Sequence, residues 1–266
     1  MTAIIIATAV VAVIGLIIGI ALVAAGKKFA VPVDEREALV REALPGNNCG
    51  ACGYAGCDAM AAAIASGEAR NNACPVCSPD AIKKISEIMG GDAIVPIKRV
   101  AFVRCAGTCD STSQKCNYVG IEDCRAAKLA GISVWECDFG CYGFGSCVQA
   151  CAFGAIHVEN GVAIVDQTKC TGCGQCVKAC PMGLIELIRA DKKVAVRCMN
   201  HDRGPAVKKV CSAGCIGCKV CTKQCENNAI VVEGNLAHIE YDKCIGCEKC
   251  AKKCPSKIIT ELNAAL

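Results

Sequence analysis

The chain opens on an uninterrupted apolar segment, because residues 3–25 include no charged side chain. A helix of that length reaches about 34 Å, which is enough to cross the hydrocarbon core of a bilayer. Lys27 and Lys28 follow the segment and no basic residue precedes it, so the positive-inside rule places the bulk of the chain in the cytoplasm. A cleaved signal peptide, the alternative, would have a basic start and a shorter apolar core. The pattern therefore predicts a transmembrane anchor over residues 1–28, crossing the cell (inner) membrane once.

Helical patterns dominate the next part of the chain. Asp34 is a candidate N-cap for a helix that a Pro-Gly pair ends at 45–46, and the apolar segment 58–69 predicts a second helix. Ser78 as N-cap, with proline at the following position, begins a third helix whose apolar residues recur at helical spacing. Residues 29–92 therefore predict a small, mainly helical module.

Strand patterns appear only in the second half of the chain. Residues 154–166 alternate around Asn160-Gly161, which is a strong hairpin signal, and residues 228–242 alternate in the same way around Gly234-Asn235. Short hairpins separated by one-turn helices are typical of the small ferredoxin fold. The overall fold class predicted is α+β: a transmembrane helix, a helical module and tandem two-cluster ferredoxin-like domains.

Cysteine is the residue that decides the chemistry. The chain has 27 cysteines in 266 residues, a level that indicates either a disulfide scaffold or dense metal binding. Cysteines on the cytoplasmic side stay reduced, and an odd number fits disulfide pairing poorly. The cysteines are therefore interpreted as metal ligands.

Four segments follow the ferredoxin pattern C-x2-C-x2-C-x3-C-P. Residues 170–181 and 244–255 match it in full, and residues 215–226 match except for glutamate at the last position. The fourth segment, 141–152, has Phe144 where the second cysteine belongs and alanine in place of proline. Zinc sites also use paired cysteines, but this longer pattern favours iron–sulfur clusters.

The four segments form an internal repeat. Cys170 and Cys244 lie 74 positions apart, and the same offset relates the other cysteines of the two halves. In a two-cluster ferredoxin, the fourth cysteine of each segment ligates the cluster of the other. Cys137, four residues before Cys141, is the candidate for the ligand missing at Phe144. The predicted ligand sets are Cys137, Cys141, Cys147 and Cys180; Cys151, Cys170, Cys173 and Cys176; Cys215, Cys218, Cys221 and Cys254; and Cys225, Cys244, Cys247 and Cys250.

Two further cysteine groups precede the repeats. In the helical module, Cys49, Cys52 and Cys57 are joined by either Cys74 or Cys77 as the fourth ligand, and we favour Cys74. Glycines between these cysteines let the loop wrap closely around a metal. The second group is irregular and predicts a further cluster, with zinc as the alternative: Cys105, Cys109, Cys116 and Cys124.

The complete count is six [4Fe–4S] clusters. Cys198 and Cys211 stand 74 positions after Cys124 and Cys137, yet the second repeat needs neither as a ligand. They are either buried thiols or thiols that exchange with the chosen ligands. Six oxidised clusters would add a charge of about −12 to the formal +4 of the chain, so its lysines balance cluster charge and do not indicate nucleic-acid binding. The predicted domains are 1–28, 29–92, 93–136, 137–190 and 191–266.

The order of these parts resembles one known family. The anchor, the sequence CGACGYAGC at 49–57 and the tandem ferredoxin segments resemble the B subunit of the Rnf-type ion-translocating ferredoxin:NAD oxidoreductase complex, over essentially the whole chain. The resemblance implies a subunit that takes electrons from reduced soluble ferredoxin. It also implies that other subunits of a membrane complex use those electrons to reduce NAD⁺ and move Na⁺ or H⁺.

The residues themselves show only an electron carrier. The chain has no dinucleotide-binding or phosphate-binding glycine motif and no candidate catalytic residues, so it is not a complete enzyme alone. Two other interpretations remain: a polyferredoxin serving a hydrogenase or another membrane reductase, and a zinc-bound scaffold without redox function.

Overall fold

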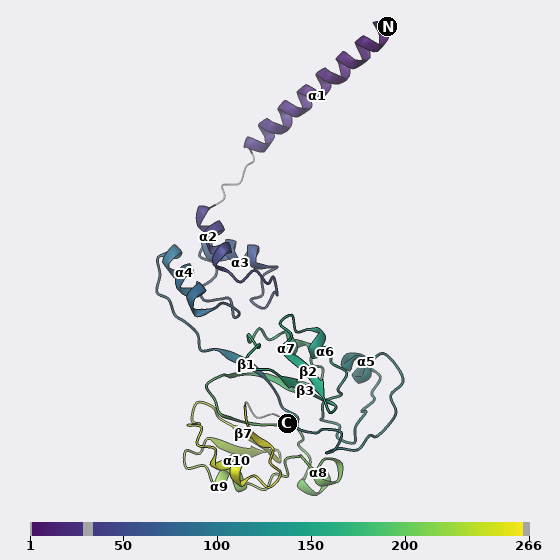
Figure 1. Cartoon of the computed structure of the whole chain (residues 1–266), viewed down its shortest axis with the longest axis vertical. Coiled ribbons are helices and arrows are strands. Elements are labelled where there is room, and N and C mark those ends of the chain that lie inside the picture. Colours follow the sequence, from purple (N-terminus) through teal and green to yellow (C-terminus); the bar gives the residue numbers. More distant parts are fainter. Residues whose placement is uncertain (1, 29–33, 263–266) are drawn as a thin grey trace.

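The computed structural model describes the backbone of residues 2–28 and 34–262 (Figure 1). Helix α1 (Thr2–Lys28) has 27 residues and projects from the folded part of the chain in Figure 1. Its side chains are described at Ile6 and from 12 to 26, and all of these are exposed. Among the residues whose side chains are described, no helix offers an apolar run long enough to cross a membrane.

Three helices form the module that follows, and all three agree with the sequence patterns. Asp34 caps the first by accepting a hydrogen bond from the amide of Arg36 at 2.9 Å, and Ser78 caps the third through the amide of Ala81 at 3.2 Å. Val40 and Ile64 are fully buried where the helices meet, so the module has its own apolar core. The helices are α2 (Glu35–Ala43), α3 (Cys57–Ala65) and α4 (Pro79–Met89).

The first ferredoxin-like domain is built on two antiparallel strand pairs. The predicted hairpin is confirmed, with Glu159 opposite Val162 across the Asn160-Gly161 turn. A second pair joins strands far apart in the sequence, with Arg99 opposite Arg189. The elements are β1 (Arg99–Val103), α5 (Cys124–Leu129), α6 (Ser146–Gln149), β2 (Ile156–Glu159), β3 (Val162–Val165), α7 (Gln175–Ala179) and β4 (Ile185–Arg189).

The second domain repeats this plan. Its hairpin is also confirmed, with Glu233 opposite Leu236 at the turn, and Val194 pairs with Glu261 in the other strand pair. The elements are β5 (Val194–Val196), α8 (Gly204–Val210), α9 (Val220–Lys223), β6 (Ile230–Glu233), β7 (Leu236–Ile239), α10 (Lys249–Lys253) and β8 (Ile259–Glu261).

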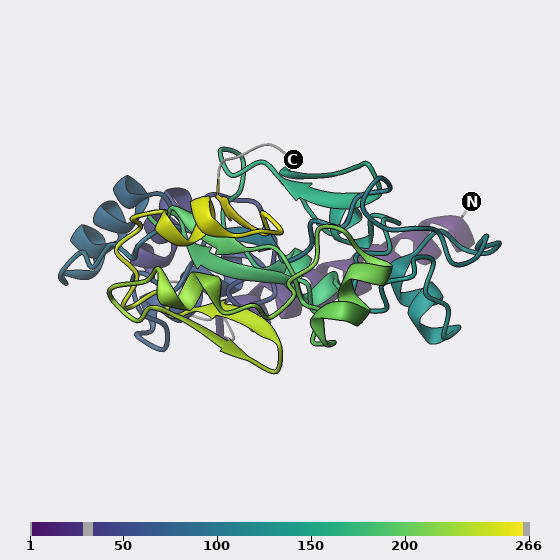
Figure 2. The same cartoon turned by 90° about the horizontal axis from the view of Figure 1, so that it is seen from below.

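The two ferredoxin-like domains pack directly on one another. Ala195 and Leu262 of the second domain are buried in the same apolar cluster as Val100 and Ile188 of the first. Figures 1 and 2 both show the green-to-yellow second domain lying against the teal first domain. Because they share this core, the domains hold a fixed orientation, and residues from both can line a common site.

Candidate metal centres

Three of the four predicted ferredoxin ligand sets each line a single cavity in the structure. Each set surrounds one cavity, and in each the fourth cysteine comes from the other cysteine segment of the same domain, as the two-cluster arrangement requires. The three cavities are lined by Cys151, Cys170, Cys173 and Cys176; by Cys215, Cys218, Cys221 and Cys254; and by Cys225, Cys244, Cys247 and Cys250.

Backbone amides point at the sulfurs of these cavities. The amide of Ala155 donates to Cys151 Sγ at 3.4 Å, and the equivalent amide of Ala229 in the second domain donates to Cys225 Sγ at 3.2 Å. The amide of Ala101 in β1 reaches Cys170 Sγ at 3.3 Å. Hydrogen bonds to cluster sulfurs are one of the features that set reduction potential, so this arrangement suits iron–sulfur ligation.

The fourth set differs from the sequence expectation by one residue. Cys141, Cys147 and Cys180 line a cavity together with Cys124. Cys137, which the sequence suggested as the replacement for the cysteine missing at Phe144, is absent from that lining. The lining of this cavity therefore favours Cys124 over Cys137 as the thiol beside Cys141, Cys147 and Cys180.

Local hydrogen bonds explain how Cys124 reaches this cavity. Cys124 is the first residue of α5, and its amide donates to Ser146 Oγ at 2.8 Å, at the start of α6. The Ser146 hydroxyl donates in turn to Asp123 Oδ2 at 2.7 Å, and the hydrogen bonds to Asp123 lower the pKa of its carboxyl. Phe144 packs against Tyr118, with 5.1 Å between ring centroids. The inserted helix α5 therefore delivers the thiol that the ferredoxin segment itself lacks.

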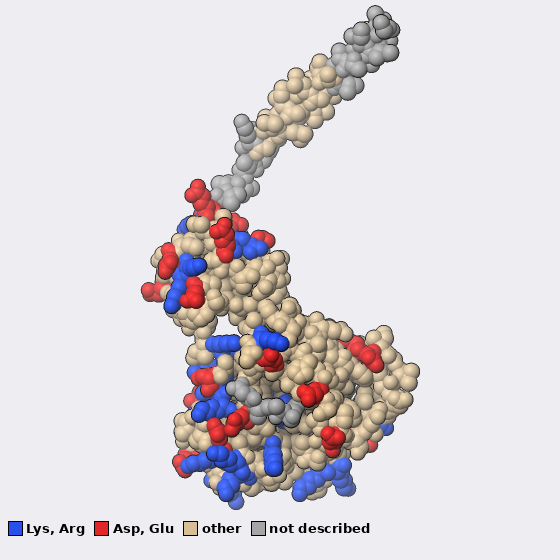
Figure 3. Space-filling model, viewed as in Figure 1, with Lys and Arg blue, Asp and Glu red and all other residues tan. Residues whose placement is uncertain are grey.

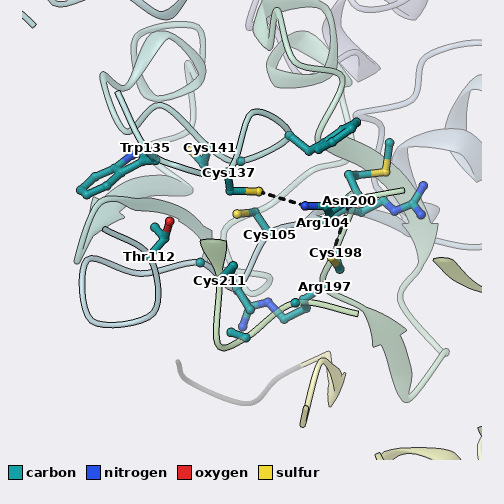
Figure 4. A pocket seen from close by; sticks show the side chains of 17 residues that line it. Arg104, Cys105, Thr112, Trp135, Cys137, Cys141, Arg197, Cys198, Asn200 and Cys211 are labelled. Carbon is teal, nitrogen blue, oxygen red and sulfur yellow. Dashed lines mark hydrogen bonds between the residues drawn. The ribbon is translucent and has the colours of Figure 1, made fainter. Parts of the chain in front are cut away.

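The expected group of Cys105, Cys109, Cys116 and Cys124 does not meet. Cys124 lines the cavity just described, whereas Cys105 lines a neighbouring cavity with Cys137, Cys198 and Cys211, and Cys141 lines both (Figure 4). Cys109 is exposed, and Cys116 donates a hydrogen bond to the Ser133 carbonyl at 3.4 Å. The four cysteines of this segment therefore lie in different surroundings.

The thiols in these cavities are hard to ionise without a metal. Burial raises the pKa of Cys147 and of Cys176 to about 12, and that of Cys221 to about 11. In each case the neighbouring thiols of the same set raise the pKa further. Iron stabilises thiolates strongly, so cluster binding would release protons and contribute to the stability of the fold.

Among the described residues, no three His, Cys, Asp or Glu side chains lie close enough to share one metal ion.

In the helical module, Cys57 and Cys74 are buried and Cys52 and Cys77 pack against the same core. The amide of Cys57 donates to the Asn48 side chain at 2.8 Å, which fixes the start of α3. A hydrogen bond between the two thiols lowers the pKa of Cys74 and raises that of Cys77. Cys74 is buried, whereas Cys77 is partly exposed, and both lie within reach of the Cys57 end of α3 as candidates for the fourth ligand.

One contact that the sequence did not suggest joins the module to the first ferredoxin-like domain. The Gln175 side-chain amide, at the start of α7, donates to the Cys49 carbonyl at 2.8 Å. Gln175 lies between Cys173 and Cys176, two of the thiols around one cavity. The candidate metal centre of the module therefore lies beside that of the neighbouring domain.

Cysteine-lined cavities in tandem ferredoxin-like domains define an iron–sulfur protein of the electron-transfer class. Known families agree: residues 44–76 match the family described as "Putative Fe-S cluster", 163–186 the "4Fe-4S binding domain" and 214–258 the "4Fe-4S dicluster domain". The first match includes Cys74 and ends before Cys77.

Curated relatives identify the family. The chain is 44% identical over 244 residues to the B subunit of the Na(+)-translocating ferredoxin:NAD(+) oxidoreductase complex of Acetobacterium woodii, covering 91% of this chain and 73% of the relative. It is 41% identical over 252 residues to the B subunit of the ion-translocating oxidoreductase complex of Methanosarcina acetivorans, covering 94% and 96%. It is 40% identical to the B subunit of the proton-translocating ferredoxin:NAD(+) oxidoreductase complex of Clostridium ljungdahlii, covering 90% and 85%.

The chain belongs to the family of B subunits of ion-translocating oxidoreductase complexes. It is an electron-transfer subunit of a membrane complex and not a complete enzyme alone.

Proposed function

We propose that this chain accepts electrons from reduced ferredoxin and passes them to partner subunits that couple NAD⁺ reduction to Na⁺ or H⁺ translocation. The observation that carries the proposal is the set of cysteine-lined cavities that runs through both ferredoxin-like domains. The names of two relatives, which are subunits of ferredoxin:NAD(+) oxidoreductase complexes, suggest the donor and the acceptor.

The cavities and the helical module support five [4Fe–4S] clusters in this proposal. A [4Fe–4S] cluster supplies one-electron transfer when bound. The chain supplies thiolate ligands, amide donors to the sulfurs and apolar walls that exclude water. The ligand sets are Cys49, Cys52, Cys57 and Cys74; Cys124, Cys141, Cys147 and Cys180; Cys151, Cys170, Cys173 and Cys176; Cys215, Cys218, Cys221 and Cys254; and Cys225, Cys244, Cys247 and Cys250.

The second domain is the better entry point for electrons. Cys218 and Cys247 are exposed, so two of its centres approach the surface. Lysine and arginine side chains gather at this end of the molecule, below the helical module in Figure 3. A soluble ferredoxin carries the negative charge of its cluster and its thiolates, and a basic surface attracts it and speeds encounter.

The helical module is the proposed exit. The hydrogen bond from Gln175 places the Cys49 loop against the first ferredoxin-like domain, and the module directly follows α1 in the sequence. Electrons entering at the second domain would therefore cross the first domain before reaching the module and the membrane partners.

We further propose that α1 anchors the chain in the cell (inner) membrane, crossing it once with the bulk of the chain on the cytoplasmic side. Support comes from its length of 27 residues, about 40 Å at helical rise, and from the absence of charge before Lys27. Its described side chains include large exposed apolar residues such as Leu16, Ile17 and Leu22. In a soluble protein, such a continuous apolar surface would require a partner.

The test uses the full-length chain assembled with its co-purifying partners under anaerobic conditions. Reduced ferredoxin is added, and cluster bleaching and NAD⁺ reduction are followed together. The proposal predicts that Cys57→Ala blocks NAD⁺ reduction while ferredoxin still reduces the remaining clusters. Cys77→Ala, in the same module, should leave both signals intact. If ferredoxin no longer reduced any cluster in Cys57→Ala, the proposed direction of electron flow would be wrong. Co-purification of the chain with a hydrogenase would favour a polyferredoxin role instead.

A further inference from the structure

A fifth cavity lies at the junction between the two ferredoxin-like domains (Figure 4). One of the cysteines around it, Cys141, also lines the cavity assigned above to the first domain. The other four belong to none of the ligand sets proposed above, and none of these four lies within a matched family region. The first domain contributes two and the second domain contributes two. They are Cys105, Cys137, Cys198 and Cys211.

The two pairs occupy equivalent places in their domains. β1 and β5 each pair with the last strand of their own domain, and each is followed by Arg-Cys, giving Val-Arg-Cys at 103–105 and again at 196–198. Cys137 and Cys211 each stand four residues before the first cysteine of a ferredoxin segment. Leftover thiols would have no reason to converge in this way, so the repeat indicates one shared function.

Hydrogen-bond donors reach two of the four sulfurs, one from each domain. The amides of Asn200 and Cys215 both donate to Cys198 Sγ at 3.4 Å. The side-chain amide of Asn200 donates to Cys137 Sγ at 3.6 Å, as the dashed line in Figure 4 shows. Cys105 and Cys211 are buried in the lining of the same cavity. Such N–H···S contacts are the surroundings that iron–sulfur ligands need.

A buried positive charge points to an anionic occupant. Arg197 lines the cavity, is only 6% exposed and has no partner for its Nε among the described residues. Its nearest recorded interaction is with the Phe102 ring, 5.8 Å from the guanidinium carbon. Arg104, the equivalent residue of the first domain, is paired with Glu186 at 3.6 Å. A buried charge without a counter-charge costs several kcal/mol, and a cluster with four thiolates would supply about −2.

We propose that Cys105, Cys137, Cys198 and Cys211 hold one further [4Fe–4S] cluster, which the two domains share and which relays electrons between them. The chain then has six clusters, and the thiols left without a metal are Cys77, Cys109 and Cys116. Its position as a relay follows from its surroundings: Cys141, a ligand in the first domain, also lines this cavity, and the amide of Cys215, a ligand in the second, donates to Cys198 Sγ at 3.4 Å.

In each step, a reduced cluster of one domain gives up one electron and returns to its oxidised state, while the shared cluster is reduced by that electron. The ferredoxin-to-membrane direction of this relay rests on the proposed function, whereas the presence of the cluster does not.

The test measures iron, acid-labile sulfide and zinc in the full-length chain, purified and reconstituted anaerobically. Cys198→Ser and Cys211→Ala should each lose about four iron atoms and four sulfides per chain. The matched controls Cys109→Ala and Cys116→Ala should lose none. Unchanged iron in both cavity variants, or loss of one zinc instead, would overturn the proposal.

Arg197 provides a second measurement that does not depend on removing a ligand. Arg197→Met should keep all the iron and lower the reduction potential of one cluster, because a nearby positive charge favours the more negative reduced state. Arg197→Lys keeps the positive charge and should therefore shift that reduction potential less. An unchanged set of potentials in Arg197→Met would contradict the proposal, and would do so even if the cysteine variants failed to fold.

The outcomes also separate this inference from the proposed function. If Cys198→Ser keeps all its iron and the complex still transfers electrons from ferredoxin to NAD⁺, the shared cluster is rejected. The proposed function then remains supported. Loss of four iron atoms in that variant, with no NAD⁺ reduction by the intact wild-type complex, would keep the site and reject the function.

Discussion

At the residue scale, the missing cysteine at Phe144 shows how a ligand can move without losing its site. In the second repeat the equivalent residue is Cys218, which lines the cavity of its own segment. In the first repeat, Cys124 lines the matching cavity from a different element, and Phe144 packs on Tyr118 instead. The two repeats thus build the same kind of cavity from different positions in the sequence.

This exchange predicts a rescue. Cys124→Ala should lose about four iron atoms per chain, and the double change Cys124→Ala with Phe144→Cys should restore them, because it returns the thiol to the segment where the second repeat carries it. Iron and sulfide analysis measures both. Phe144→Cys should not restore iron to Cys137→Ala, which empties a different cavity. Rescue of Cys137→Ala and not of Cys124→Ala would return the ligand role to Cys137.

A second prediction at this scale concerns Gly172, between Cys170 and Cys173. Its backbone has a φ of +71°, and an added Cβ would lie 2.4 Å from the Arg99 carbonyl oxygen in β1. Gly172→Ala should therefore lower the free energy of unfolding by about 1–3 kcal/mol and loosen the neighbouring cluster. Gly154→Ala, also at positive φ but facing open space, controls for backbone conformation alone. Thermal unfolding of the reconstituted proteins should show a larger loss of stability in Gly172→Ala than in Gly154→Ala. Equal losses would show that the contact with the Arg99 carbonyl oxygen is not the cause.

At the element scale, the elements predicted correctly are those with local signals. The hairpins follow from turn residues placed between alternating segments, and the helices of the module follow from caps and apolar spacing. The pairing of β1 with β4 joins residues about 90 positions apart, for which no local pattern exists. The offset of 74 positions pairs Cys124 with Cys198, yet these residues are not structurally equivalent. Cys124 begins α5, whereas Cys198 follows β5. The ligands of the shared cavity depend on these distant pairings, so the sequence could not group them.

Helix α5 gives the prediction that belongs to this scale. The Asp123 carboxylate accepts hydrogen bonds from the amides of Arg125 at 2.8 Å and Ala126 at 3.0 Å, and from the Ser146 hydroxyl. Asp123→Ala should cost about 1–2 kcal/mol of stability and make one cluster labile, because the cap holds Cys124 against α6. Asp123→Asn keeps an acceptor oxygen and should lose less. The measurement is thermal unfolding together with the rate of iron release to a chelator, and equal behaviour of the two variants would contradict the capping role.

At the scale of the whole molecule, the contacts between parts describe a continuous path. The module meets the first ferredoxin-like domain through Gln175 and Cys49, and the two domains meet at the shared cavity. At each junction, the residues in contact are proposed cluster ligands or residues adjacent to one in the sequence. The repeat offset revealed two ferredoxin-like domains, but only the packed structure shows that their spare thiols face one another.

Deleting residues 1–28 tests the anchor at this scale. No proposed ligand is removed, so the truncated chain should retain its iron and still be reduced by ferredoxin. Mixed with its membrane partners, it should reduce NAD⁺ slowly, because a tethered donor has a high effective concentration that a free one lacks. Recovery of the full rate at micromolar chain would argue against an anchoring role, whereas loss of iron would show that the segment supports the fold.

The most direct test of the account is the metal content of the full-length wild-type chain after anaerobic reconstitution. Six [4Fe–4S] clusters predict about 24 iron atoms and 24 sulfides per chain, without stoichiometric zinc. Iron near 20 would contradict the shared cluster between the domains. Iron near 16 would leave only four of the proposed centres, and zinc in place of iron would contradict the electron-transfer function itself.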